Sequence, residues 1–564
     1  MSITINKMLS KFKLKGSNKR NISHRKLLAQ LKPSGFLVLV TIFVNILRRC
    51  VFGIMKFLEN PILHPIIFSI YPILFIYAHN ITELFPKVLL LPISASILST
   101  LFLLVIFYLF QKDIYKSGIL TSATLILFFN FLAISVFLME HFKLFNSRAD
   151  IFLLYIAIIA VLMFILWKTK INTKVFTSFL NVTSVFLLIS ILSIIVPYEI
   201  NIRNKINIEN KSIQNNEDNV LIGGRDIYYI VLDSYGRQDI LKEDYDFDNT
   251  EFINYLQSKG FYIASESHSN YAFTHLSLPS TFNFEYLDYI NKIYGTDRLK
   301  IDPFLNKLFQ ENKAAQFLKS KGYQFINFDS GWWFTQNVPI ADVNVRKGAV
   351  SSFLGKNYSI DDFTVCLLNT TALAPFIKEK LVDSARGRIL YNFSKLSELP
   401  YKRQNKFVFA HFLVPHPPYL FDENGNNVPD KSPSGFSKEL DIKQLQYVNK
   451  LAKITIDRIL SRSDKKPIII LASDHGPLIP GLDGYNNPPR DLAKRRMSNL
   501  NAYYFPDGGD ALLYNSITPV NSFRVMFNYY FGTSYKLLED KSYFSWANDL
   551  YRFYDVTNEI NYKE

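Results

Sequence analysis

The sequence predicts an N-terminal bundle of transmembrane α-helices, followed by an α/β domain in which a mostly parallel sheet is sandwiched between helices. First, the segment from Pro61 to about Pro197 contains apolar stretches that are each about long enough to cross a ~30 Å hydrocarbon core. Second, strand-like and helix-like patterns alternate from Asp226 onward, which is typical of a parallel sheet. Third, two strand-like apolar runs end on Asp233 and on Asp474, the position where open α/β sheets carry functional side chains. With 564 residues and 49% hydrophobic content, the chain is too long and too apolar for one ordinary soluble domain.

Five stretches are predicted to span the membrane, and together they define a transmembrane domain at residues 61–197. They lie near residues 61–78, 88–110, 118–138, 150–167 and 176–196. Residues 35–58 are also apolar, but Arg48, Arg49 and Lys56 interrupt them. We therefore interpret this segment as a possible interfacial helix within a basic cytoplasmic N-terminus at residues 1–60, with a sixth span as the alternative.

The distribution of charge predicts the orientation of the chain. Residues 1–33 contain nine Lys and Arg and no acidic residue, and the loops at 111–117 and 168–174 add further lysines. By the positive-inside rule these segments are cytoplasmic, so the C-terminal domain is extracytoplasmic in a bacterial-type cytoplasmic (inner) membrane, which the chain crosses several times. The net charge of +15 resides largely in this flank, where anionic lipids attract it, and we expect no nucleic-acid partner.

The segment after the last span predicts a linker and then one large domain. Residues 198–225 lack a periodic apolar pattern and form the linker, and residues 226–564 form the extracytoplasmic domain. Its predicted strands lie at 227–232, 261–265, 323–328, 407–412 and 467–472, and its predicted helices at about 249–260, 312–320 and 441–461. The only cysteines are Cys50 at the membrane and Cys366 in this domain, so we expect no disulfide.

Metal-ligand side chains at the ends of two strands predict a metal site. Asp233 follows the run IYYIVL, and Asp474 and His475 follow PIIILAS. A single strand can end in Asp simply because Asp caps turns, but two such ends, one with an adjacent His, favour a shared ion. Carboxylate oxygen combined with imidazole nitrogen suits zinc or manganese, and we expect one of these divalent metals as cofactor.

Two further histidines lie in the segment KFVFAHFLVPHPPYLF. A strand delivers His411, and a proline-stiffened turn fixes His416, which is an arrangement suited to a preorganised substrate site. The alternative is an aromatic loop with two incidental imidazoles. His268 and His275 are interpreted as structural residues, because an isolated histidine is more often a hydrogen-bonding core residue than a ligand.

The order of these residues resembles that of the alkaline phosphatase and sulfatase superfamily. The resemblance rests on Asp233 after a strand, a Thr about forty residues later, His-x4-His, and Asp-His-Gly after a late strand. The apolar spans ahead of the domain resemble the membrane-anchored branch, which includes lipoteichoic acid synthases and lipid A phosphoethanolamine transferases.

The resemblance implies a role for each site residue. Asp233, Asp474 and His475 take the places of the family's metal ligands, and Thr274 in Thr-x2-Ser-x-Pro that of the metal-bound nucleophile. His416 takes the place of a substrate-side or second-metal histidine and is predicted to be catalytic. The predicted substrate-binding residues are His411, His416, Trp332, Trp333 and Arg496. The alternatives are core packing for the two tryptophans and a solvated basic face for Arg496.

The implied function is that of a membrane-bound phosphotransferase. It would move a phospho-alcohol headgroup, phosphoethanolamine or phosphoglycerol, from a phospholipid donor to an envelope glycan or lipid acceptor through a phospho-threonine. The alternatives are a sulfatase-like hydrolase of phosphate or sulfate esters, a non-catalytic envelope assembly protein, and a transporter, which spans with few ionisable residues disfavour. A formylglycine sulfatase is also disfavoured, because Thr281 stands where the motif from Ser277 would require Arg.

Overall fold

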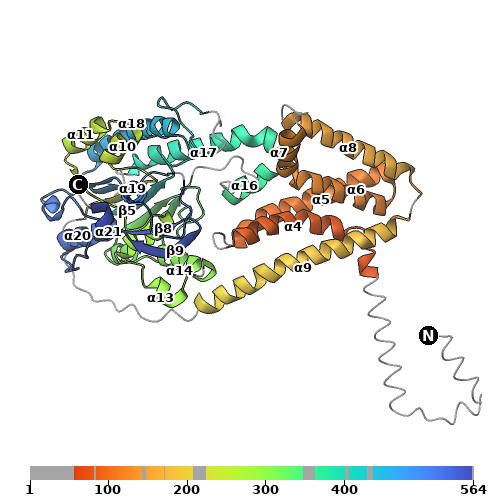
Figure 1. Ribbon diagram of the computed structural model, residues 1–564, viewed down its shortest axis with the longest axis horizontal. Coiled ribbons are helices and arrows are strands. Elements are labelled where there is room, and N and C mark those ends of the chain that lie inside the picture. Colours follow the sequence, from red (N-terminus) through yellow and green to blue (C-terminus); the bar gives the residue numbers. More distant parts are fainter. Residues whose placement is uncertain are drawn as a thin grey trace, which may run out of the picture.

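The computed structural model describes residues 56–561 apart from 82, 83, 85, 143–147, 171, 207–223, 297, 347–361, 400–404, 429–435 and 480. A helical bundle lies at one end of the elongated molecule, and an α/β domain lies at the other (Figure 1). The predicted interfacial helix and sixth span at 35–58 fall almost entirely outside the described residues.

The bundle contains a helix in each of the five predicted stretches. These are α4 (Leu63–His79), α5 (Leu90–Gln111) after the short η1 (Pro86–Leu89), α6 (Ile114–Phe129) with α7 (Phe131–Phe142), α8 (Arg148–Lys168) and α9 (Thr173–Ile206). Among the described residues, three helices are long and apolar enough to cross a membrane, at Pro86–Gln111, Asp150–Lys168 and Thr173–Ile200. α4, with 17 residues, is apolar but shorter than these candidates. The three long apolar helices show that the chain is a membrane protein.

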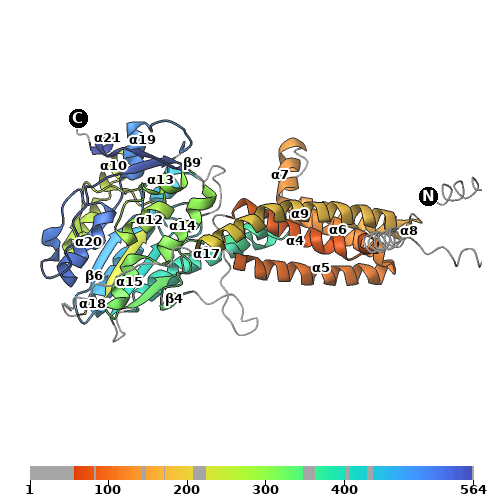
Figure 2. The ribbon, with the colours of Figure 1, turned by 90° about the horizontal axis from the view of Figure 1, so that it is seen from below.

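The third predicted span, 118–138, differs from a single straight helix. It is broken at Asn130, where α7 turns by 63° from α6, and the pair counts as a fourth span only if both parts are taken together. The Asn130 side chain donates to the Ile126 carbonyl at 2.8 Å and caps the end of α6, which is how Asn competes with helical backbone bonds. Figure 2 shows α7 standing out sideways from the bundle.

The last helix also extends further than the sequence predicts. α9 continues past Pro197 to Ile206, so it includes the start of the segment that we predicted to be a linker from residue 198. Its C-terminal end reaches α14 (Arg298–Gln310) of the α/β domain (Figure 1). The loss of one backbone donor at Pro197 does not end a helix that runs for 34 residues.

The α/β domain is built on a seven-stranded mixed sheet in the order β2-β7-β6-β1-β5-β3-β4. The strands are β1 (Ile227–Leu232), β2 (Tyr262–Ile263), β3 (Gln324–Phe328), β4 (Val343–Val345), β5 (Lys406–Phe412), β6 (Ile468–Ala472) and β7 (Asn501–Tyr504). All neighbouring pairs from β6 to β4 are parallel, whereas β7 is antiparallel to both of its neighbours. The predicted mostly parallel sheet is confirmed. Every residue of β1 is buried, as expected for a central strand covered on both faces.

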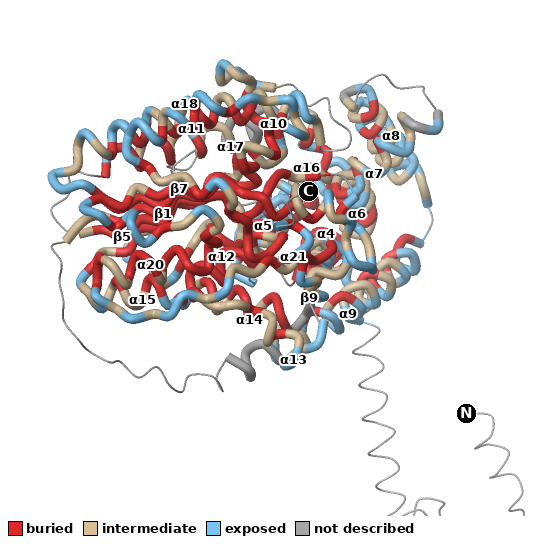
Figure 3. Tube along the Cα trace, turned by 60° about the vertical axis from the view of Figure 1, so that its left-hand side comes forward, coloured by how far each residue is buried: buried red, intermediate tan, exposed pale blue. Residues whose placement is uncertain are grey.

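Helices cover both faces of the sheet (Figure 3). One face packs against α12 (Thr274–Asn283), α15 (Lys313–Ser320) and α20 (Pro519–Phe531), and the other packs against α11 (Thr250–Ser258), α17 (Ala374–Leu396) and α18 (Lys438–Arg462). Alternate residues of β1 enter the two cores: Tyr229 faces the first, whereas Tyr228 and Ile230 face the second. This arrangement agrees with the sandwich predicted from the alternating pattern.

The remaining elements surround this framework. They are α10 (Gln238–Tyr245), α13 (Ile290–Tyr294), α16 (Asp362–Thr370), α19 (Arg490–Met497), η3 (Gly509–Leu512), the β8 (Tyr543–Trp546) and β9 (Asp549–Asp555) hairpin, and α21 (Thr557–Asn561). The sequence reasoning identified none of these elements, because most are short and lack a clear apolar period.

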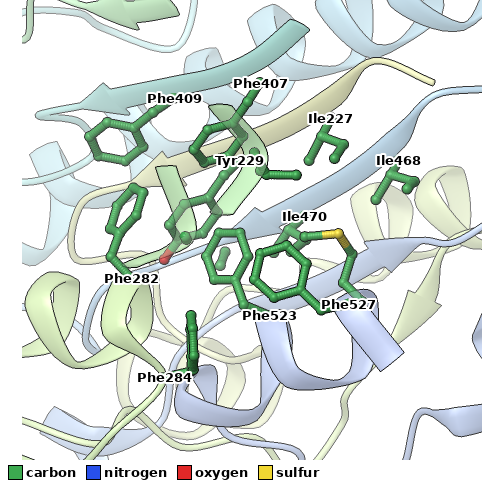
Figure 4. Packing of buried hydrophobic residues seen from close by; sticks show 14 of the residues in the cluster. Ile227, Tyr229, Phe282, Phe284, Phe407, Phe409, Ile468, Ile470, Phe523 and Phe527 are labelled. Carbon is green, nitrogen blue, oxygen red and sulfur yellow. The ribbon is translucent and has the colours of Figure 1, made fainter. Parts of the chain in front are cut away.

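Phe282 is the side chain that ties helix α12 to the sheet. Its ring lies 4.9 Å from that of Phe409 and 5.4 Å from that of Tyr229, measured between centroids, and α20 covers it with Phe523 (Figure 4). Phe282→Ala is expected to lower the free energy of unfolding of this domain by about 3–5 kcal/mol, through lost burial and a residual cavity. Chemical denaturation of the full chain in detergent measures the change. The matched control is Ile454→Ala on the exposed side of α18, which is expected to cost less than about 0.5 kcal/mol.

Asp441, in the first turn of α18, makes the stability of the domain depend on pH. Burial raises the pKa of its carboxyl to about 7 against the opposing effect of the Tyr245 hydroxyl. Because the folded state holds this proton more tightly than the unfolded chain, the free energy of unfolding falls as pH rises from about 4 to about 7, by as much as about 4 kcal/mol. Asp441→Asn should remove this fall and raise the melting temperature at pH 8. Asp457→Asn, at an exposed acid on the same helix, is the control, and an unchanged slope in Asp441→Asn would contradict the assignment.

Candidate metal centre and active site

Three neighbouring parallel strands carry metal-ligand side chains to the same edge of the sheet. Asp233 follows the last residue of central strand β1, and Asp474 lies two residues beyond the end of β6. His411 lies within β5, directly opposite Val231 in the parallel register. Because β6, β1 and β5 are adjacent, the carboxyl ends of these strands bring together residues that are far apart in sequence.

These three side chains form a cluster that could hold a cation. Each contributes one ligand atom, and the three atoms lie within 4.8 Å of one another. All three residues are buried. Asp233 Oδ1, His411 Nε2 and Asp474 Oδ2 have no hydrogen-bond partner. Buried carboxylate oxygens without a donor are costly, so a divalent cation fits both the geometry and the chemistry of this donor set.

His475 joins the cluster through its Nε2 atom. This atom lies 3.3 Å from Asp474 Oδ2 and 3.7 Å from Asp233 Oδ1. The other ring nitrogen, Nδ1, lies 2.9 Å from the Gly476 carbonyl, to which it can donate only when protonated. Burial and the nearby Arg496 lower the pKa of His475 to about 4. A neutral imidazole with its proton on Nδ1 therefore directs the Nε2 lone pair toward the cluster.

Thr274 lies at the edge of the same cluster. Its Oγ1 atom is 3.3 Å from His475 Nε2, and it is the first residue of helix α12. The N-terminus of a helix favours negative charge, so this position suits a hydroxyl that must develop charge. Ser277, one turn further along α12, instead donates to the Tyr271 carbonyl at 2.9 Å.

The electrostatic balance of the cluster keeps Asp233 ionised. Burial alone would raise the pKa of its carboxyl, but the neighbouring imidazoles of His416, His411 and His475 outweigh burial. Together they hold the pKa of Asp233 well below its usual range. The cluster is thus organised around a carboxylate rather than a carboxylic acid.

Polar groups behind the cluster orient its members. Thr335 Oγ1 lies 2.9 Å from His411 Nδ1, which directs the opposite nitrogen, Nε2, toward Asp233. The Asp233 Oδ2 atom lies 3.5 Å from that nitrogen. On the other side, the Ser473 hydroxyl donates to the His475 carbonyl at 2.7 Å, and the Ser234 amide lies 3.3 Å from Asp474 Oδ1. Such contacts fix the orientation of metal ligands in proteins.

The predicted substrate-side residues surround the cluster to different degrees. The His416 amide donates to the Asp233 carbonyl at 3.2 Å, which holds this partly buried histidine beside the centre. Trp332 lies with its ring 6.1 Å from the His411 ring in an edge-to-face arrangement. Trp333 packs on Trp332 and on Phe334 in the core.

Arg496 is buried and bonds to the backbone on both sides of the site. Its Nε donates to the Ala272 carbonyl at 2.8 Å, and its Nη1 lies 3.3–3.4 Å from the carbonyls of Gly476 and Pro477. It therefore connects the loop that precedes Thr274 with the loop that follows His475. The bonds that the structure shows for this guanidinium are to protein carbonyls, whereas the sequence predicted a substrate-binding role.

The sequence reasoning placed His411 on the substrate side and missed its position among the metal-ligand atoms. The sequence did contain a signal, because His411 lies near the carboxyl end of a predicted strand. In the structure this strand is adjacent and parallel to the strand that precedes Asp233, so both residues lie at the same edge of the sheet. Thr335, Ser234 and Ser473 were also missed, since isolated hydroxyl residues carry no distinctive pattern.

His268, predicted to be structural, lies outside the cluster. It accepts a hydrogen bond from Arg237 at 3.1 Å and lines a separate polar cavity of about 820 Å³. The lining residues of this cavity include none of Asp233, His411, Asp474 and His475. The buried ligand atoms, rather than this cavity, therefore define the candidate active site.

Comparison with known proteins gives a family match over the α/β domain. The model of the family described as Sulfatase matches residues 225–523, which is more than half of the chain. The matched region contains the four residues predicted from sequence as metal ligands as well as His411. No curated protein matches the chain significantly.

Solved structures similar to this chain include several bacterial membrane-associated transferases. The periplasmic domain of EptC from Escherichia coli, in complex with zinc, is 11% identical, and the alignment covers 55% of this chain and 83% of that chain with a TM-score of 0.35. Phosphoethanolamine transferase EptC from Campylobacter jejuni is 14% identical over 56% of this chain and 92% of its periplasmic domain, with a TM-score of 0.35. The integral membrane lipooligosaccharide phosphoethanolamine transferase A from Neisseria meningitidis is 13% identical over 81% of this chain and 94% of that chain, with a TM-score of 0.35. At these scores the likenesses carry no information about the chemistry of this site.

The cluster predicts that metal binding depends on His411 as well as on the acids. Full-length protein purified in detergent should contain a bound divalent metal, and His411→Ala and Asp474→Ala should each lose most of it, because each removes one of three converging ligand atoms. Elemental analysis by mass spectrometry measures the metal content. Asp464→Ala, at an exposed acid in the loop before β6, is the control and should keep the wild-type content. Retention of the full metal content in His411→Ala would show that His411 is not a ligand.

Proposed function

Because this chain belongs to the sulfatase family, we propose that it is a membrane-bound, metal-dependent phosphotransferase that acts through Thr274. It is an enzyme of this superfamily, and the proposal concerns its reaction. The donor is a phospholipid, the transferred group is a phospho-alcohol headgroup such as phosphoethanolamine or phosphoglycerol, and the acceptor is an envelope glycan or lipid. The observation that carries the proposal is the position of the Thr274 hydroxyl, 3.3 Å from His475 Nε2 beside a buried cluster of carboxylate and imidazole ligands.

The proposed metal is zinc or manganese, held by Asp233, His411 and Asp474 with His475 beside them. A mixture of carboxylate oxygen and imidazole nitrogen suits these ions better than calcium or magnesium. When bound, such an ion lowers the pKa of a coordinated hydroxyl and polarises a phosphoryl oxygen.

In the first half of the proposed reaction, the Thr274 oxygen, whose proton leaves to solvent before the attack and returns after the second displacement, attacks the phosphorus of the donor. A bond forms between this oxygen and phosphorus, and the bond from phosphorus to the diacylglycerol oxygen breaks. The N-terminus of α12 stabilises negative charge on the threonine oxygen and on the phosphoryl group. His416, held beside the cluster by its bond to the Asp233 carbonyl, is positioned to give a proton to the leaving oxygen.

In the second half, a hydroxyl of the acceptor takes the group from Thr274. The acceptor oxygen forms a bond to phosphorus, the threonine ester breaks, and the acceptor proton passes to His416, which had lost one in the first half. The two displacements replace one direct transfer from donor to acceptor. Each of them takes place at the same fixed threonine oxygen, so donor and acceptor need not be bound together. Water in the acceptor position would give the hydrolase that remains the alternative.

The residues at the nucleophile position disfavour formylglycine chemistry. That chemistry requires a cysteine or serine that begins a motif with a later arginine, but Thr281 occupies the arginine position counted from Ser277. Cys366 lies on α16, outside helix α12 and the metal-ligand cluster. Between Thr274 and Ser277 of helix α12, it is the Thr274 hydroxyl that approaches the cluster.

The proposed topology places this site on the outer side of a bacterial-type cytoplasmic membrane. The basic N-terminus and the lysine-containing loops at 111–117 and 168–174 support a cytoplasmic position for those segments. These two loops lie at the end of the bundle opposite to that from which α9 leads to the α/β domain (Figure 1). This placement gives the domain access to lipid headgroups of the outer leaflet.

Replacement of Thr274 tests the proposed nucleophile. Wild-type protein, incubated with phosphatidylethanolamine or phosphatidylglycerol, should release diacylglycerol and carry the headgroup phosphate on the peptide that contains Thr274. Thr274→Ala should lower diacylglycerol release by at least about a thousandfold and abolish the modified peptide, because the attacking oxygen is gone. Mass spectrometry of the lipids and peptides measures both products.

Ser277→Ala is the matched control for this experiment. It removes a hydroxyl on the same helix whose bond is to a backbone carbonyl, and it should retain most activity. Unchanged activity in Thr274→Ala together with loss in Ser277→Ala would reassign the nucleophile. Release of free phospho-alcohol without transfer to any added acceptor would favour the hydrolase.

A further inference from the structure

The α/β domain sends one uncharged helical hairpin into the membrane bundle. This segment, which we term the apolar hairpin, comprises residues 363–377: most of α16, the turn at 371–373 and the first turn of α17. It contains no Lys, Arg, Asp or Glu, although charged residues border it at 361–362 and 378–380. It belongs to the connection between β4 and β5 and therefore precedes the strand that carries His411.

One side of the apolar hairpin is packed against helices of the bundle. Phe363 and Leu367 of α16 are buried in a cluster with side chains of α4, α6 and α9, which include Tyr77 and Phe129. Ala372 in the turn lies in a second cluster with Ile151 and Tyr155 of α8 and Phe131 of α7. Figure 1 shows α16 beside α4 and α7, at the end of the bundle that faces the α/β domain.

The contacts with α8 indicate how far the hairpin extends along a membrane-spanning helix. The candidate span of α8 begins at Asp150. The Phe376 ring packs edge-to-face on the Phe152 ring with centroids 4.9 Å apart, and Ala372 shares a cluster with Tyr155. Tyr155 lies about 8 Å along the helix from Asp150, at ~1.5 Å per residue. This distance along the helix is similar to the depth of about 5–10 Å at which amphipathic segments lie at the boundary of headgroups and acyl chains.

The backbone of the turn is suited to an environment without water. The Thr371 amide donates to the Leu368 carbonyl at 3.1 Å, the Ala372 amide to Phe128 of the bundle at 3.0 Å, and the Ala374 amide to Thr371 at 3.0 Å. The Leu373 amide donates to the Thr371 hydroxyl at 3.3 Å, and Pro375, which follows Ala374, has no amide hydrogen. Satisfaction of each backbone donor within the protein is the condition for a turn that enters lipid.

The other side of the apolar hairpin exposes large apolar side chains. Leu373 is 43% exposed and Phe376 is 55% exposed. On the neighbouring bundle helices, Leu153 of α8 and Phe137 of α7 are also exposed. Because Phe376 packs on Phe152 of a candidate membrane span, acyl chains are the environment that matches these exposed side chains.

We infer that the apolar hairpin inserts into the bilayer leaflet on the side of the α/β domain, with Leu373 and Phe376 in contact with acyl chains. This inference goes beyond the proposed function and does not rest on it. From its first turn in the membrane, α17 continues to the sheet, where Ile389, Phe393 and Leu396 are buried in the core beneath β5. The insertion therefore fixes the height of the α/β domain above the bilayer through one continuous helix.

A fluorescent probe at Leu373 tests this inference in the full-length chain. Cys50→Ser and Cys366→Ser remove the native cysteines, and Leu373→Cys provides one labelling site at the tip. The protein is reconstituted into vesicles of phosphatidylethanolamine and phosphatidylglycerol and labelled with an environment-sensitive fluorophore. Lipids with a nitroxide on the acyl chain should quench the probe several-fold more than iodide in the aqueous phase does.

Two comparisons make the result decisive. The probe moved to Lys465→Cys, in an exposed loop at the end of α18, should show the opposite preference. Phe376→Glu should shift the probe at 373 toward iodide quenching, whereas Leu512→Glu, at an exposed apolar side chain of η3, should not. Quenching by iodide at 373 would overturn the inference. Protection from both quenchers would overturn it as well, because a protein surface rather than lipid would then cover the tip.

Discussion

The structure of the α/β domain depends on the burial of two carboxylates beside two imidazoles at one edge of the sheet. Asp233 and Asp474 are almost completely removed from water, and each retains an oxygen without a hydrogen-bond donor. Such groups would destabilise the fold unless positive charge lies close to them. The buried Arg496 supplies part of that charge, and a divalent cation would supply the remainder. Binding of a metal would therefore stabilise the folded state at this edge of the sheet.

The order of strands determines which side chains can meet at this edge. Because β1 lies between β6 and β5, its terminal aspartate is adjacent to ligands from both neighbours. The long connections that parallel strands require then carry the other functional parts. The segment between β1 and β3 contains α12 with Thr274, and the segment between β4 and β5 contains the apolar hairpin. Two crossovers of one sheet thus position the proposed nucleophile and the proposed membrane contact relative to the same cluster.

Much of this arrangement is predictable from sequence where the signal is local. The continuous apolar runs of β1 and β6 identify the central strands, and Asp233, Asp474 and His475 follow them directly. The position of His411 among the ligands depends on strand order, which hydrophobic patterning does not specify. The break at Asn130 was missed because both flanking segments are apolar. The apolar hairpin was missed because a nine-residue helix such as α16 resembles a core helix until its packing against the bundle is known.

The position of Thr274, the proposed nucleophile, illustrates the advantage of a helix that is anchored elsewhere. Its hydroxyl lies at the first residue of α12, where the amide dipoles favour negative charge, while Phe282 near the other end of the helix is locked among aromatic rings from β1, β5 and α20. Arg496 holds the loop before Thr274 to the loop after His475 through backbone carbonyls. The threonine oxygen therefore moves with the sheet that carries the metal ligands. The proposed reaction requires this rigidity, because the Thr274 oxygen would serve first as nucleophile and then as leaving group at an unchanged position.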